Sequence, residues 1–176
     1  MTKNKININR APVLTLWAAI VAERLGHDRL EALTLGKAVA GLNAQSKGRR
    51  IGIYAEKTEE EKAKEKEEAR TSGQHTVAIL GRPVPVVKTP HGSRAAIQGE
   101  AIDPESVQTY LEQKFGDRFE EARLALEQLA RHYSPRELET RAYDLYEKFR
   151  PEIPEGKKGW GAKGELDLDY VRSLAK

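Results

Sequence analysis

The sequence predicts a mainly α-helical fold that carries one small β-hairpin. Apolar residues recur at helical spacing over 12–46 and again over 103–149, and two β-branched runs flank a turn within 76–89. A chain of 176 residues fits one domain or two small ones, and either can bury a core.

We expect four parts in chain order. They are a basic N-terminal helical hairpin (1–55), a charged connector (56–75), a β-hairpin unit (76–100), and a helical block with a Gly/Lys-rich loop and a terminal helix (101–176).

The helical hairpin has recognisable ends. Pro12 suits a first helical position, and Gly26 suits the left-handed residue that ends a helix. Asp28 and Glu31 then have the spacing of a capping box, which marks the start of the second helix. Residues 12–46 are therefore predicted to form two antiparallel helices.

Packing between these two helices is also predicted. Trp17 lies on the apolar face of the first helix and Val39 on that of the second, so each is expected to be buried against the other helix. Glycine lowers helix propensity, so Gly36 and Gly41 inside the second helix indicate the close approach of another backbone.

Polar and basic segments flank the helical hairpin. Residues 1–11 have the composition of a disordered basic arm. Lys47–Arg50, with the sequence KGRR, is expected to be an exit loop, and residues 51–54 a short strand that follows it.

Residues 56–70 are almost wholly charged, with both signs mixed. Such a segment is typical of a solvated helix or of a linker, and both alternatives stay open. Its own negative balance argues against a nucleic-acid-binding arm. We expect it to be exposed to solvent and to contribute little to the core.

The β signal lies in 76–89. Its two apolar runs flank Gly81-Arg82-Pro83, which is typical of a hairpin turn. Pro85 interrupts the second run and indicates an edge strand, because proline cannot donate to a ladder.

Three helices with short connections are predicted in the C-terminal block, over about 103–116, 117–133 and 135–149. Asp103 is expected to cap the first of them, and Ser134 with Glu137 forms a capping box before the third. A terminal helix should follow a cap at Asp167.

Charge is unevenly distributed along the chain. Residues 1–55 carry a net charge of +6, residues 71–99 carry +3, and residues 156–176 carry +2, whereas residues 100–155 carry −6. This asymmetry favours a polyanionic partner for the basic parts, or docking of the two halves on each other.

Composition favours a cytoplasmic protein. Cysteine is absent, which excludes a disulfide framework and thiolate metal sites. Neither a membrane-spanning apolar run nor a signal-peptide core occurs, so no membrane partner is expected. Abundant Lys and Glu with a single Met give a thermophile-like composition.

Nothing in the sequence indicates an enzyme. No nucleophile elbow, phosphate-binding loop or dinucleotide fingerprint is present, and the four histidines lie apart. We therefore expect no catalytic residue, no cofactor and no metal site. His91, in the turn Pro90–Ser93, is the one histidine that merits a test, and we favour its interpretation as a plain loop residue.

Three basic features favour nucleic-acid binding. The first is Lys37 with the KGRR segment, the second is the β-hairpin, and the third is the Gly/Lys-rich loop, in which free backbone N–H groups and an aromatic ring can meet phosphate and base. The candidate residues are Lys37, Lys47, Arg49, Arg50, Arg82, Lys88, Arg94, Lys157, Lys158, Trp160 and Lys163.

Each feature also has an ordinary explanation. The KGRR segment can be a solvated helix end, Arg82 can keep a hairpin soluble, and Trp160 can anchor the terminal helix, which we favour over stacking. Two helices followed by a β-hairpin resemble the element order of a winged helix, although that fold usually has three helices before its wing.

The sequence thus predicts a DNA- or RNA-associated protein that binds through phosphate contacts, with a regulatory role as one candidate function. The alternative is a non-enzymatic interaction or scaffold protein that forms a homo-oligomer, or binds a protein, through apolar helix faces.

Overall fold

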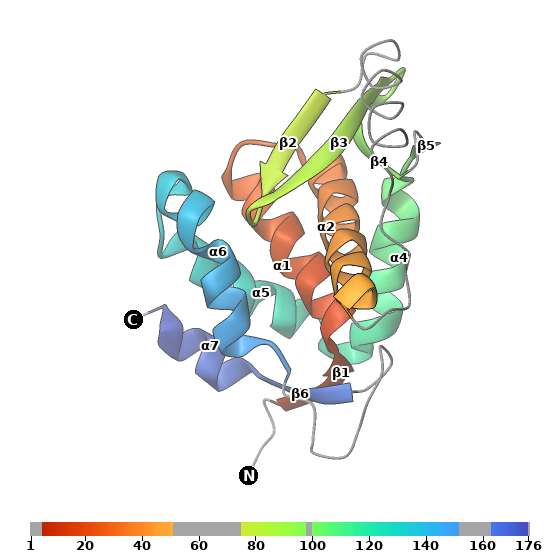
Figure 1. Cartoon of the computed structure of the whole chain (residues 1–176). Helices are drawn as coiled ribbons and strands as arrows, with labels where there is room; N and C mark the ends of the chain where they lie inside the picture. The colour runs from red at the N-terminus through yellow and green to blue at the C-terminus, as the bar shows by residue number, and fades with distance from the viewer. Residues whose placement is uncertain (1–4, 51–74, 98–99, 152–162, 176) are drawn as a thin grey trace.

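Helix α1 (Arg10–Arg24) lies in the middle of the fold (Figure 1). The computed structural model describes residues 5–50, 75–97, 100–151 and 163–175. Within these residues α1 packs against α2, α4, α5 and α6, and every residue from Pro12 to Ala22 is buried. A helix that is surrounded by other elements buries residues on all its sides, which explains why the apolar residues of α1 are not confined to one face of the helix.

The predicted helical hairpin is confirmed, with α2 (Arg29–Arg50) running antiparallel to α1 (Figure 1). Gly26 has a φ of 109°, and the backbone N–H of Glu31 donates to Asp28 Oδ1 at 2.9 Å. Only this half of the expected capping box is formed, because the Glu31 carboxylate pairs instead with His27 Nδ1 at 3.0 Å.

One of the two glycines in α2 marks the helix crossing. A Cβ atom built on Gly36 would lie 2.3 Å from the carbonyl oxygen of Thr15, so α1 and α2 can touch only because that side chain is missing. A Cβ on Gly41 would meet nothing within 4 Å, so the prediction of close approach holds for Gly36 alone.

Trp17 and Val39 are both fully buried. The indole of Trp17 faces α6 (Pro135–Phe149): its Nε1 donates to the carbonyl oxygen of Ala142 at 2.9 Å, and its ring meets Phe149 edge-on at 5.3 Å. The sequence pattern located this side chain in the core but assigned it the wrong neighbouring helix.

The exit loop predicted at Lys47–Arg50 is wrong, because the backbone of these residues continues α2 as a helix. The side chains of residues 43–50 lie outside the described part of the structure, as do the expected strand at 51–54 and the connector 56–70.

The predicted β-hairpin is present as β2 and β3, and two further strands extend it into a four-stranded antiparallel sheet. Its strands are β2 (His75–Ile79), β3 (Arg82–Thr89), β4 (Gly92–Ile97) and β5 (Glu100–Ala101), in that order. Leu80 and Gly81 form the two-residue turn between β2 and β3 with φ of 51° and 75°, so Arg82 already belongs to a strand. The sheet packs on α2, where the N–H of Ala95 donates to the buried Thr34 Oγ1 at 2.9 Å.

Pro85 does not lie in an edge strand, which corrects the prediction. It belongs to β3, between β2 and β4, and lies opposite Thr76 of β2. The β3–β4 ladder begins only at Val86 opposite Ala95, so Pro85 is outside the stretch where β3 has neighbours on both sides. A missing N–H is tolerated there.

The N-terminal residues Lys5–Asn9 form β1, so the expectation of a disordered arm is wrong for them. This strand pairs antiparallel with β6 (Lys163–Asp167) at the other end of the chain. Ile6, Ile8 and Leu166 are buried between this ladder and the helices. The ladder lies at the opposite end of the molecule from the four-stranded sheet (Figure 1).

The predicted helices of the C-terminal block are confirmed. They are α4 (Pro104–Phe115), α5 (Phe119–Arg131) and α6, and each packs on α1. Asp103 caps α4 and Ser134 with Glu137 forms the capping box of α6. Asp167 caps the terminal helix α7 (Leu168–Leu174), which packs on α5.

None of the helices in the described ranges combines the length and apolar character that crossing a membrane requires.

Candidate functional site

Two lysines converge on one aromatic ring where α2 meets α4. The ammonium nitrogen of Lys37, on α2, lies 4.0 Å from the centre of the Tyr110 ring, and that of Lys114 lies 6.0 Å from the same centre. Tyr110 and Lys114 are both on α4, one helical turn apart. We call these three residues the lysine–tyrosine cluster.

The cluster is electrostatically unfavourable for its own cations. Burial lowers the pKa of Lys37, and the positive charge of Lys114 lowers it further. Burial also raises the pKa of Tyr110, so its hydroxyl stays neutral. Contact with the ring offsets part of the cost by cation–π attraction. An anion placed beside the two lysines would stabilise both charges.

Several other cations of the helical block have carboxylate partners. Arg118 pairs with Glu121, Arg123 with Glu120 and Glu127, and Arg172 with Asp169. By contrast, Lys37 and Lys114 form no ion pair with any residue in the described ranges. No described carboxylate therefore pairs with either charge, and the feature that sets the cluster apart is the position of both ammonium groups over one ring.

Of the eleven candidates from the sequence, Lys37 is the one that the structure places in this cluster. Lys47, Arg49 and Arg50 follow it on the same helix, about 15 Å or more along the axis at 1.5 Å per residue. Their side chains are not among those described.

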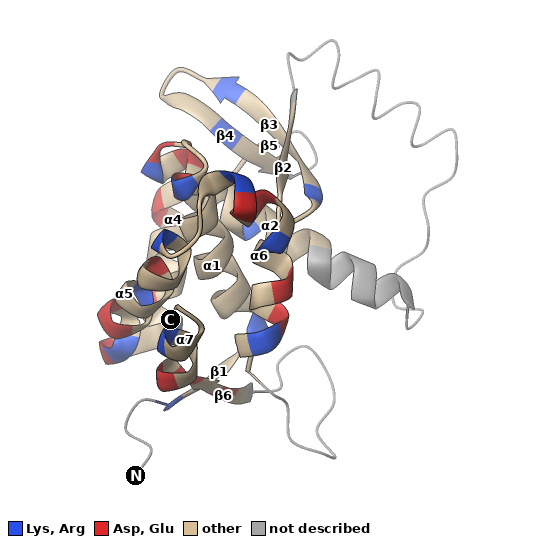
Figure 2. Ribbon diagram, turned by 90° about the vertical axis from the view of Figure 1, so that its left-hand side faces the viewer, with Lys and Arg blue, Asp and Glu red and all other residues tan. Residues whose placement is uncertain are grey.

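The candidates in the sheet lie elsewhere. Arg82 begins β3 and is half-buried, whereas Lys88 is exposed near the far end of that strand. Arg94 is only 5% exposed, and its guanidinium donates to the carbonyl oxygens of Ser93 and His91 at 2.8 and 3.2 Å. Arg94 thus stabilises the β3–β4 turn and presents little surface to a ligand. Figure 2 shows basic residues on β3 and β4 and no acidic residue on β2, β3 or β4.

The third feature is only partly described. Lys157, Lys158 and Trp160 lie outside the described residues, and for Lys163 the structure gives the backbone position in β6. That position is at the end of the molecule remote from the sheet (Figure 1). The described anchor points of the second and third features therefore do not share one surface.

Sequence reasoning missed Tyr110 and Lys114 as site residues. Their spacing of four on a predicted helix indicates that the two side chains meet, and this could have been noticed. Their meeting with Lys37 depends on how α4 packs on α2, which no local pattern reveals.

His91, the histidine selected for testing, is exposed in the β3–β4 turn, where its backbone N–H donates to Thr89 Oγ1 at 3.2 Å. Across the described ranges no group of three or more His, Asp or Glu side chains is arranged to hold a metal ion.

The apolar faces of the helices are largely used within the fold. The exposed large apolar side chains in the described ranges are Leu30, Leu124 and Tyr170, on α2, α5 and α7 respectively. They lie on three different helices, as isolated exposed apolar residues do on ordinary protein surfaces.

No family model matches the chain, and searches of curated proteins and of solved structures give no match either.

Proposed function

We propose that the protein associates with nucleic acid, DNA or RNA, through contacts to phosphate, and that the lysine–tyrosine cluster is one such contact. The observation that supports this proposal is the convergence of Lys37 and Lys114 on one ring, where neither forms an ion pair with a described residue. The two ammonium groups, one from α2 and one from α4, form a positively charged site over one ring, and each can neutralise a phosphate.

In the proposal, three further cations of α2 also contact phosphate. Lys47, Arg49 and Arg50 lie on the same helix as Lys37, so one helix carries four of the candidate cations. Lys88 on β3 provides a further contact at the periphery. Arg94 is buried and is not part of the proposed phosphate-binding surface. Phosphate contacts carry no sequence information, so binding should show little preference between sequences.

We expect Lys37→Gln/Lys114→Gln to weaken binding to a random duplex by about five- to a hundredfold at moderate salt, because two phosphate contacts are lost. The slope of log affinity against log salt should fall by about 1.8, since each contact contributes about 0.9 on duplex DNA. Fluorescence anisotropy at several salt concentrations, on a duplex and on a single strand, measures both quantities.

The matched control is Arg136→Gln/Lys148→Gln, which removes two exposed positive charges from α6. Equal losses for the two double variants would show an effect of net charge alone and would contradict a role for the cluster. Circular dichroism must show that all variants remain folded.

A second test concerns the end of α2. Replacing Lys47, Arg49 and Arg50 together by Ala should weaken binding by roughly ten- to a thousandfold, similarly for any sequence, because up to three phosphate contacts are lost. If the wild-type protein binds neither nucleic acid in a salt-sensitive way, the proposal fails. The alternative, binding of a protein partner or of a second copy, then takes its place.

A further inference from the structure

A shallow hollow of about 60 Å³ opens between α1, α2, α4 and α5, on residues that the proposed function does not use. One water molecule occupies about 10–15 Å³ when volume is measured in this way. The hollow therefore has room for about four to six groups the size of a water molecule or a methyl group. Its apolar floor is made by Leu16, Ala19, Ile20, Leu33, Leu111 and Phe119.

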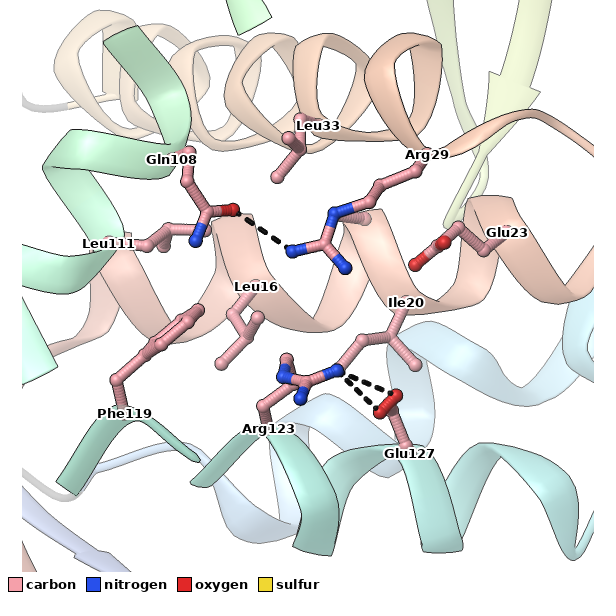
Figure 3. Close-up of a pocket in the computed structure, with 11 residues that line it drawn as sticks. Leu16, Ile20, Glu23, Arg29, Leu33, Gln108, Leu111, Phe119, Arg123 and Glu127 are labelled. Atoms are coloured by element: carbon pink, nitrogen blue, oxygen red, sulfur yellow. Dashed lines mark hydrogen bonds and ion pairs between the residues drawn. The ribbon is translucent and has the colours of Figure 1, made fainter. Parts of the chain in front are cut away.

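The rim carries both signs of charge and an amide. Figure 3 shows the Arg29 guanidinium between Gln108 on one side and Glu23 on the other, with Arg123 and Glu127 across the hollow. Arg29 Nη2 donates to Gln108 Oε1 at 3.3 Å, a long hydrogen bond that leaves most of the guanidinium available. This end of the hollow suits a carboxylate.

Arg123 contributes a fixed donor below Arg29. Its Nη1 donates to Glu127 Oε1 at 3.1 Å and its Nη2 to Glu120 Oε2 at 2.7 Å, so the guanidinium is held in place. Its Nε is buried and donates to no acceptor in the described part of the chain. A ligand oxygen would satisfy this N–H.

The other end suits a cation. The Glu23 carboxylate accepts no hydrogen bond from any residue in the described ranges. Partial burial raises the pKa of Glu23, the charge of Arg29 opposes that shift, and Glu127 adds to it. Two carboxylates near each other favour an ammonium group between them.

We propose that the hollow binds a small zwitterion with a branched aliphatic group, that is, a free aliphatic α-amino acid. Its carboxylate meets Arg29, Gln108 and Nε of Arg123, and its ammonium meets Glu23 and Glu127. The four carbons of an isobutyl group match the space above the apolar floor. A ligand that carried only a negative or only a positive charge would pair with one end of the rim and leave the other end unpaired.

The test uses the full chain and three probes: L-leucine, 4-methylpentanoate, which lacks the ammonium group, and 3-methylbutylamine, which lacks the carboxylate. Isothermal titration calorimetry and ligand-observed NMR of the methyl groups measure binding. We expect leucine to bind at least about tenfold more tightly than either analogue. Arg29→Met and Glu23→Gln should each weaken leucine binding by about tenfold or more.

Matched controls are Arg136→Met and Glu139→Gln, exposed on α6, which should leave leucine binding unchanged. Arg29 and Glu23 are also exposed, so loss of folding is not expected, and thermal unfolding checks it. Absence of leucine binding at about 20 mM overturns the proposal, and so does equal binding of either analogue. Unchanged leucine affinity in both rim variants would place any binding elsewhere and would also overturn it.

Discussion

Replacing Trp17 by Ala is expected to lower the free energy of unfolding by about 3–5 kcal/mol, the largest single-residue effect that we predict. The indole is fully buried, donates to Ala142 and meets Phe149 edge-on, so truncation removes apolar contacts, a hydrogen bond and an aromatic pair together. Trp17→Phe keeps most of the ring contact but loses the N–H, and should cost about 1–2 kcal/mol.

Urea unfolding followed by circular dichroism gives these values. The matched control is Tyr170→Ala on α7, whose ring is 42% exposed, and it should change the stability by less than about 1 kcal/mol. A loss below about 1 kcal/mol for Trp17→Ala would mean that α6 does not pack on α1 as described.

Two Gly→Ala replacements in α2 should have opposite signs. Alanine favours a helix over glycine by about 1 kcal/mol, so Gly41→Ala, with open space around it, should stabilise the protein by up to that amount. Gly36→Ala places a Cβ against the Thr15 carbonyl oxygen and against the backbone nitrogen of Ala19, and helix α1 must move to relieve the clash. We expect a net loss of about 2 kcal/mol or more.

The same urea titrations measure both glycine variants. Both variants replace glycine by alanine in the same helix, so the gain from helix propensity is similar in the two. The difference between their changes in unfolding free energy therefore measures the cost of the clash at the helix crossing. If Gly36→Ala stabilised the protein as Gly41→Ala does, the close contact between α1 and α2 would be absent in solution.

Features specified by neighbouring residues were predictable. The α6 helix starts where Ser134 and Glu137 bond reciprocally, and the α4 helix starts where Asp103 accepts from the N–H of Glu105. These interactions span three residues or fewer, so both partners lie within one short segment of the sequence and the pattern can be recognised there. The apolar periodicity of α5 is equally local.

Features that depend on remote partners were not predictable. Ile6 and Ile8 alternate as a strand does, but the strand that pairs with them comes near the other end of the chain. Pro85 indicates an edge strand when the sequence is considered alone. The proline is tolerated inside the sheet because β4 begins to pair with β3 only at Val86. Trp17 was assigned to the core correctly, but its hydrogen-bond acceptor belongs to α6.

The candidate site follows the same division. Lys37 was selected because it lies on a helix that leads into a basic segment, whereas its significance depends on Tyr110 and Lys114 of α4. Arg94 was selected for its charge, which the β3–β4 turn uses internally. Charge counts identify cations, and only the folded chain shows which ones are already neutralised or bonded.

The pairing of β1 with β6 has a consequence for the order of folding. On a ribosome, β1 is synthesised long before β6, so the two strands cannot pair until the helices and strands between them have emerged. Helix α1 follows β1 directly and can meanwhile pack with α2. Closing so long a loop costs entropy, although the cost grows only slowly with length. Docking of β1 on β6 is therefore a late step in folding, and contacts of such high sequence separation slow folding.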